Sequence, residues 1–251
     1  MIINAFLQAR VSSTRLPNKV LKTLSGKEML LQQIDRLRLS KKIDNIIVLT
    51  STDRSDDVLE ELCKSHKIDI FRGDLKDVLS RYEQALEIYP CDNVVRITGD
   101  CPLIDWAVVD HVINEHLANG GDYTSNTIKP TYPDGLDVEV IKSSSLSDAS
   151  LKAIRPYERE HVTYYIYQHP DIYEINNIIN PLEDESDLRW TVDEASDFEF
   201  IRVIYEELYQ GYPFSTNEVR KLLKKYPDIS SINKGLIRNE GLYKSLKEFD
   251  K

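Results

Sequence analysis

The feature that most constrains the fold is a regular alternation of short apolar segments with longer amphipathic ones in the first half of the chain. Four apolar runs predict buried strands, at residues 2–7, 43–50, 68–71 and 93–98. The segments beside them carry apolar residues at helical spacing and predict helices, at residues 27–39, 53–65, 75–88 and 106–118. Because the strands lack polar alternation and are separated by helices, the pattern predicts a mostly parallel sheet with helices on both faces.

A different rhythm follows Gly120 and Gly121. Residues 124–133 are polar and rich in turn formers, and further strands are expected at 136–141, 172–179 and 188–192. Further helices are expected at 143–152, 156–168, 195–210 and 217–225. We interpret residues 1–225 as one α/β domain that carries an inserted arm at about 120–180, and residues 226–251 as a peripheral C-terminal segment.

Composition narrows the class of partner. The 32 Lys and Arg against 42 Asp and Glu give a net charge of −10, whereas a nucleic-acid-binding surface needs a basic excess. The three cysteines, Cys63, Cys91 and Cys101, form neither a disulfide framework nor a zinc pattern. No apolar run approaches the length of a membrane span, and the first residues lack the basic region of a signal peptide. We therefore expect a cytoplasmic protein that binds neither nucleic acid nor membrane.

The loop after the first strand, QARVSSTRLPNK at residues 8–19, opposes this global charge. It carries Arg10, Arg15 and Lys19, and the first 27 residues hold five basic residues and no acidic one. In an open α/β sheet, ligands bind outside the carboxyl ends of the strands. Guanidinium, ammonium and hydroxyl groups there suit a polyphosphate, although charge alone leaves a solvated basic loop equally possible. The loop is neither a P-loop nor a GxGxxG fingerprint.

Two later motifs place carboxylates at the ends of predicted strands. In VVRITGDCPLID, at residues 94–105, Asp100 follows the fourth strand, where a carboxylate can hold Mg²⁺ or can simply serve a turn or a cap. Asp105 in the same motif is placed to cap the next helix. In LRWTVDEASDF, at residues 188–198, Asp193 ends an extended run and is most simply a helix N-cap. Asp197 in that motif is expected at the surface.

These three motifs together resemble those of the CMP-KDO synthetase-like cytidylyltransferases, in the branch of spore-coat polysaccharide biosynthesis. The resemblance implies a Rossmann-like, GT-A-type nucleotidyltransferase fold. It also implies transfer of CMP from CTP to an acidic sugar or phosphorylated acceptor, with release of pyrophosphate. By the same match Arg10, Arg15 and Lys19 are triphosphate ligands, and Asp100 and Asp193 bind Mg²⁺.

The resemblance also implies substrate-binding residues elsewhere in the chain. Ser12 and Ser13 are candidate helpers in the loop. The base, ribose and acceptor sites would draw on further residues, which are Ser51, Thr52, Arg72, Asp134, Asp137, Arg159 and His161. Two of these have simple structural alternatives, because Arg72 can pair with a nearby aspartate and His161 can be an interface histidine.

The sequence thus favours a Mg²⁺-dependent cytidylyltransferase that binds CTP and a small anionic acceptor. A GT-A glycosyltransferase needs a DxD motif, which the segment after the fourth strand lacks. A non-catalytic nucleotide-binding protein of this fold would have lost the basic loop or Asp100, and both are present. The tyrosines at 157, 164, 165 and 167 favour pairing of the arm in a homodimer.

Overall fold

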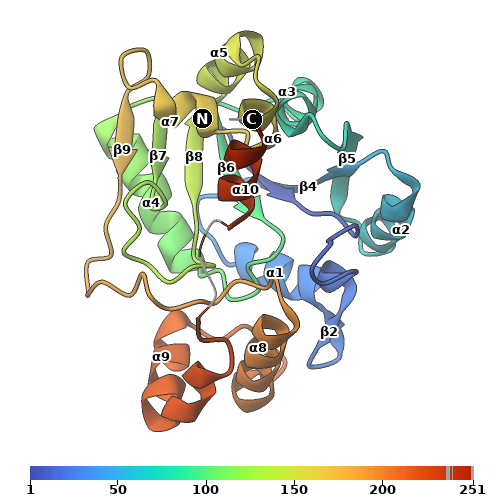
Figure 1. Cartoon of the computed structure of the whole chain (residues 1–251), viewed down its shortest axis with the longest axis vertical. Helices are drawn as coiled ribbons and strands as arrows, with labels where there is room; N and C mark the ends of the chain where they lie inside the picture. The colour runs from blue at the N-terminus through green and yellow to red at the C-terminus, as the bar shows by residue number, and fades with distance from the viewer. Residues whose placement is uncertain (236–237, 239, 250–251) are drawn as a thin grey trace.

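The computed structural model describes residues 1–235, 238 and 240–249. Within this part of the chain, one sheet of seven strands runs in the order β5-β4-β1-β6-β8-β7-β9 (Figure 1). The strands are β1 Ile3–Gln8, β4 Asn45–Ser51, β5 Asp69–Gly73, β6 Asn93–Thr98, β7 Tyr123–Ser125, β8 Glu139–Lys142 and β9 Ile175–Asn177.

The direction of the strands confirms a mostly parallel sheet. β1 pairs parallel with β4 on one side and with β6 on the other, and β4 pairs parallel with β5. β8 runs antiparallel to both β6 and β7. The chain builds β1, β4 and β5 outward and then returns to place β6 beside β1. The carboxyl ends of β1 and β6 therefore flank the point where the strand order reverses, which is where such sheets bind ligands.

Helices cover both faces of the sheet, as the alternation predicts. One core lies against α1 Met29–Leu37, α2 Asp57–Ser65, α4 Trp106–Asn119, α8 Ala195–Leu208 and α9 Thr216–Lys225. The other lies against α3 Val78–Ile88, α5 Ser143–Lys152 and α7 Tyr164–Gln168, and α6 Pro156–Glu160 packs beside α3 and α7. Successive residues of β1 divide between them, because Ala5 and Leu7 join the first core and Phe6 joins the second.

Several expected elements differ in the structure. The helix predicted at 156–168 is two helices, because Val162 has a left-handed φ of 51° that interrupts the backbone. The strand predicted at 188–192 is wrong, since this stretch forms only one isolated bridge, between Asp134 and Arg189. A short hairpin of β2 Thr23–Leu24 and β3 Lys27–Glu28 precedes α1. Asp105 does cap α4, accepting the Ala107 N–H at 2.8 Å.

The segment at 120–180 is built into the domain. It contributes β7, β8 and β9 to the central sheet, and α5 to α7 to one of its faces (Figure 1). Its proposed role in a dimer stays a prediction. None of the described helices combines the length and the apolar character needed to cross a membrane.

The C-terminal segment differs from the peripheral position we expected. After the short helix η3 Pro227–Ser231, α10 Glu240–Phe249 returns to pack against α6, where Ser245 Oγ donates to Glu160 Oε2 at 3.1 Å (Figure 1). Residues 236–237, 239 and 250–251 of that predicted segment lie outside the described residues.

Candidate active site

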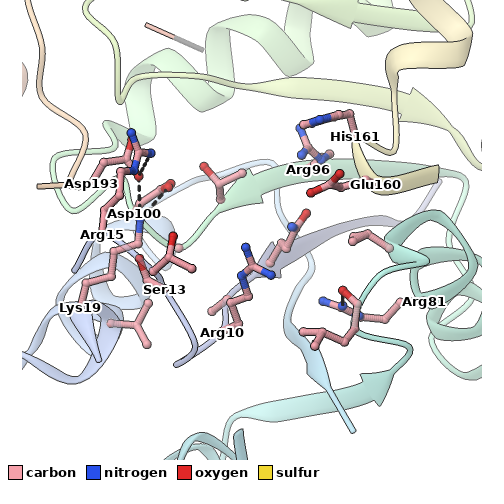
Figure 2. Close-up of a pocket in the computed structure, with 18 residues that line it drawn as sticks. Arg10, Ser13, Arg15, Lys19, Arg81, Arg96, Asp100, Glu160, His161 and Asp193 are labelled. Atoms are coloured by element: carbon pink, nitrogen blue, oxygen red, sulfur yellow. Dashed lines mark hydrogen bonds and ion pairs between the residues drawn. The ribbon is translucent and has the colours of Figure 1, made fainter. Parts of the chain in front are cut away.

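Two adjoining cavities open at the carboxyl ends of β1 and β6. The first, of about 340 Å³, lies between the basic loop, the start of α3 and the end of β6 (Figure 2). The second, of about 520 Å³, lies between β6, β8, the turn at 161–163 and α10. Six side chains line both cavities and so form their common wall: Arg15, Arg96, Thr98, Asp100, His161 and Asp193.

The first cavity collects basic side chains from three separate elements. Arg10, Arg15 and Lys19 come from the loop after β1, Arg81 comes from α3 and Arg96 from β6 (Figure 2). Three carboxylates share this lining, those of Asp100, Glu160 and Asp193. The excess of cations suits a polyanionic ligand such as a nucleoside triphosphate.

Lys19 lies between the two predicted metal ligands. Its Nζ is 3.1 Å from Asp100 Oδ2 and 3.0 Å from Asp193 Oδ1, and it also donates to the Val192 carbonyl at 2.7 Å. Burial lowers the pKa of the Lys19 ammonium, but the two carboxylates outweigh burial and raise it. Burial likewise raises the pKa of Asp100, yet the ammonium beside it brings that pKa down to about 2. The Lys19 ammonium and the Asp100 carboxylate are therefore both charged at neutral pH.

The backbone brings Asp193 to Asp100 from far along the chain. The Val192 N–H donates to the Asp100 carbonyl at 2.8 Å. Arg189 then fixes the following turn, donating to Asp193 Oδ2 at 3.1 Å and to Asp197 Oδ1 at 2.9 Å. Asp197 is fully buried, which corrects the surface position expected from the sequence. Its carboxylate also accepts the backbone N–H of Asp193, and the N-cap of α8 is Glu194, so the Asp193 side chain faces the cavity.

Asp100 and Asp193 fit a Mg²⁺ ion bound together with a nucleotide. Their oxygens converge on one point, since both contact the same Lys19 nitrogen. Mg²⁺ prefers oxygen ligands and is commonly held by one or two carboxylates together with substrate phosphates. Among the described residues no group of three or more His, Cys, Asp or Glu side chains gathers as a metal site. The arrangement therefore suits an ion that arrives with phosphate oxygens.

A buried carboxylate that sequence reasoning missed anchors the basic loop. Asp56 accepts the Val11 N–H at 2.7 Å and the Ser51 N–H at 3.1 Å, and the Ser51 hydroxyl also donates to it. Through these hydrogen bonds, Asp56 joins the loop after β1 to the end of β4. Ser51, predicted to contact substrate, is fully buried in this anchor and lines neither cavity.

The second cavity is rich in carboxylates that carry their own counterions. Asp134 pairs with Arg189 at 2.9 Å, Asp137 pairs with Arg238, and Glu139 pairs with Arg96. Burial and the neighbouring carboxylates raise the pKa of Asp137 to about 7, because Arg238 offsets them only in part.

Gly135 lets the acidic turn approach the backbone that leads to Asp193. Its φ is +109°, and a Cβ there would lie 2.6 Å from the Trp190 carbonyl carbon. Only glycine fits such a position. The Trp190 N–H donates to the Asp134 carbonyl at 2.6 Å across this contact. Gly135 thus lets the turn that carries Asp134, which lines the second cavity, pack closely against the backbone leading to Asp193.

Arg96 and His161 present unpaired nitrogens at the wall between the cavities (Figure 2). Arg96 Nε and His161 Nε2 are buried and have no hydrogen-bond partner among the described residues. Desolvation lowers the pKa of His161, so its imidazole is neutral at pH 7. Buried polar atoms usually have partners, so these two nitrogens leave part of the shared wall without hydrogen bonds from the described residues.

Four predicted residues besides Ser51 also lie away from the cavities. Arg72 lies on the edge strand β5, where it donates to the Ser51 carbonyl at 2.8 Å and pairs with Glu60 of α2 at 2.5 Å. Arg159 ties α6 to the N-cap of α3 through Asp77 at 2.7 Å. Thr52 and Ser12 are exposed and line neither cavity.

The remaining predicted residues do gather at the two cavities. Arg10 and Ser13 line the first, Asp134 and Asp137 line the second, and His161 lines both. The structure adds lining residues that the sequence did not indicate, among them Arg96, Glu160 and Glu240. Arg96 had a local signal, a charged residue inside an apolar strand, whereas the others become neighbours only through the fold.

Comparisons with known proteins agree with this geometry. A sequence model of the Cytidylyltransferase family matches residues 4–236. The chain is 33% identical over 231 residues to the spore coat polysaccharide biosynthesis protein SpsF of Bacillus subtilis, covering 90% of this chain and 95% of that protein. It is 38% identical over 240 residues to the uncharacterized protein MJ1063 of Methanocaldococcus jannaschii, covering 93% and 95%.

A solved structure supports the same assignment. The structure of a cytidylyltransferase from Leptospira borgpetersenii superposes with a TM-score of 0.88 at 32% identity, covering 95% of this chain and 100% of that one. The chain belongs to the cytidylyltransferase family and is a nucleotidyltransferase.

Proposed function

We propose that this enzyme transfers CMP from CTP to a small anionic acceptor, releasing pyrophosphate, with Mg²⁺ as cofactor. The acceptor class we favour is an acidic or phosphorylated sugar used in surface polysaccharide or glycoconjugate synthesis. The observation that carries the proposal is the meeting of a basic first cavity and a second, sugar-sized cavity at Asp100, Asp193 and Arg96. The similarity to SpsF, named for polysaccharide biosynthesis, supports the acceptor class.

In this proposal the loop cations bind the triphosphate. Arg10 and Arg15 line the first cavity and would contact the β- and γ-phosphates, which leave as pyrophosphate. Lys19 already faces both carboxylates, so its ammonium lies where the nucleotide's negative charge and theirs would meet. Asp100 and Asp193 would hold the Mg²⁺, which supplies positive charge to the phosphates when bound.

The second cavity supplies the acceptor's contacts. An anionic group of the acceptor would bind the Arg96 guanidinium, and an acceptor hydroxyl would bind the neutral His161 imidazole. The carboxylates of Asp134 and Asp137 would accept hydrogen bonds from further hydroxyl groups. The acceptor oxygen then approaches the α-phosphate from the side opposite the loop, as in-line displacement requires.

Pyrophosphate release tests the reaction. The protein is incubated with Mg²⁺, a panel of acidic and phosphorylated sugars and each nucleoside triphosphate in turn. We expect pyrophosphate with CTP and not with ATP, GTP or UTP. A glycosyltransferase would instead consume a nucleotide sugar and release no pyrophosphate. Equal thermal stabilisation by all four triphosphates would remove the preference for CTP and leave the triphosphate site standing.

We also propose a cytoplasmic homodimer that pairs through residues 120–180. In this segment Leu151 and Ile154 are 86% and 83% exposed, which is unusual for large apolar side chains. They adjoin a surface cavity lined by Tyr157, Tyr164 and Tyr165. Tyrosine and exposed apolar side chains are enriched at protein interfaces. A sedimentation mass of one chain at micromolar concentration would contradict the dimer, and Ile154→Lys should shift a dimer toward monomer.

A further inference from the structure

Residues 240–249 lie over the second cavity although the family match ends before them. The match covers residues 4–236, whereas Arg238 and α10 follow it. We call Arg238 and residues 240–249 the C-terminal strap. Glu240, Leu242 and Tyr243 of the strap line the second cavity, and Ser245, midway along α10, donates to Glu160. The strap therefore spans the site from the basic loop to α6.

Glu240 engages an arginine that the triphosphate would need. Its Oε2 is 2.5 Å from Arg15 Nη1. Arg15 also contacts Asp193 at 3.0 Å and Glu194 at 3.6 Å, but those two residues belong to the turn that builds the site. Glu240 is the carboxylate that the strap adds. A carboxylate and a phosphate compete for the same face of a guanidinium, because both accept its paired N–H groups.

Arg238 makes the opposite contact on the acceptor side. Its guanidinium pairs with Asp137, lies 3.8 Å from Asp134 and donates to the Tyr132 carbonyl at 3.1 Å. The strap thus places an anion on the cation of the first cavity and a cation on the anions of the second. The charges of the strap thus complement the lining of each cavity.

We propose that the C-terminal strap is an internal competitor, in which Glu240 occupies Arg15 and Arg238 occupies Asp137 until CTP and the acceptor displace them. The inference rests on the proposed function, because it takes the first cavity as the triphosphate site. Displacing Glu240 is inexpensive, since Arg15 and Glu240 are 29% and 38% exposed and such ion pairs contribute little. Separating Arg238 from Asp137 costs more, since those side chains are 15% and 27% exposed. CTP binding at Arg15 then releases the strap and opens the second cavity to the acceptor.

Nucleotide affinity tests the competition. Isothermal titration of CTP with Mg²⁺ compares the full-length protein with Glu240→Gln, which keeps the shape of the side chain and removes its charge. We expect Glu240→Gln to bind CTP about two- to fivefold more tightly, the value of one partly exposed ion pair. Glu199→Gln removes an equal charge from the exposed face of α8, away from the site, and should leave the affinity unchanged. Unchanged or weaker binding by Glu240→Gln would overturn the competition.

Hydrogen exchange tests the displacement itself. Backbone amides of residues 240–249 should exchange faster when Mg²⁺ with CTP, or Mg²⁺ with inorganic tripolyphosphate, is added to the wild-type protein. Slower or unchanged exchange with both ligands would overturn the strap proposal. Faster exchange with tripolyphosphate, without any binding of CTP, would support the strap and instead refute the proposed nucleotide.

Discussion

The two cavities share a wall, but basic side chains predominate in the lining of the first and acidic side chains in that of the second. Five basic and three acidic side chains line the first cavity, whereas two basic and six acidic side chains line the second. Two aspartates show the consequence. The ammonium of Lys19 brings the pKa of Asp100 down to about 2, while burial among other carboxylates raises the pKa of Asp137 to about 7. The first cavity is therefore ready for a polyanion, and the second must exchange counterions to admit a ligand.

The largest effect expected at the shared wall comes from Asp100→Asn. The change removes one of the two carboxylates that would hold Mg²⁺ against the triphosphate, which should cost roughly 10³-fold in turnover, or about 4 kcal/mol of transition-state stabilisation. The side chain is 26% exposed, so the fold should survive. Steady-state pyrophosphate release measures the loss, and the thermal midpoint checks the fold. A variant that keeps a tenth of the wild-type kcat would move the metal site elsewhere.

Lys19→Ala should show how far the ammonium neutralises the carboxylates of Asp100 and Asp193. Without it, Asp100 and Asp193 face each other with no cation between them, and we expect the free energy of unfolding to fall by about 2 kcal/mol. That corresponds to a midpoint lower by about 4–8 °C for a chain of this size. Because Mg²⁺ can replace the missing charge, adding it should stabilise the variant more than the wild type.

Lys22→Ala is the matched control for that change. Lys22 lies over the Phe198 ring and lines neither cavity, so its removal should not alter the response to Mg²⁺. An equal response to Mg²⁺ in the wild type and in Lys19→Ala would show that the ammonium does not neutralise the two carboxylates.

The raised pKa of Asp137 predicts a pH dependence of stability that belongs to the second cavity. In the unfolded chain this carboxyl loses its proton near pH ~4, whereas the folded protein keeps it until about pH 7. Folded-state stability from this group is thus present at low pH and is lost as the pH rises through 7. Between pH 5 and pH 8 the wild type should lose about 2–3 kcal/mol relative to Asp137→Asn, measured by urea unfolding. A difference that does not change with pH would contradict the shift.

The first cavity could be predicted from the sequence because its parts follow strand ends. Apolar runs located β1 and β6, and the rule that ligands bind at the carboxyl edge then placed Arg10, Lys19 and Asp100 together. The motif around Asp193 was found as well. The contact that carries it to Asp100, from the Val192 N–H, joins residues that no local pattern connects.

The second cavity shows why the rest could not be predicted. Asp137 and Arg238 are 101 residues apart, and Arg15 and Glu240 are 225 apart, so their pairing depends on the completed fold. The turn that presents His161 depends on Val162 in a left-handed conformation. Valine rarely adopts it, and the sequence carries no glycine or asparagine there to indicate the turn. Asp197 looked like an exposed first-turn residue, because its burial depends on Arg189 reaching it from the preceding segment. Local pattern locates elements, but the contacts between distant segments decide which side chains meet.

The smallest expected effect comes from comparing two arginines predicted to bind substrate. Arg10 lines the first cavity, whereas Arg72 lines neither cavity. Arg10→Ala should raise the KM for CTP about fivefold, since Arg10 lines the cavity and would contact phosphate. Arg72→Ala should change that KM less than twofold, because its guanidinium is engaged with Glu60, Asp57 and backbone carbonyls outside both cavities. Its cost should appear as a loss of less than about 1 kcal/mol in unfolding free energy. A KM effect of Arg72→Ala as large as that of Arg10→Ala would mean that the nucleotide extends past β4 to the edge of the sheet.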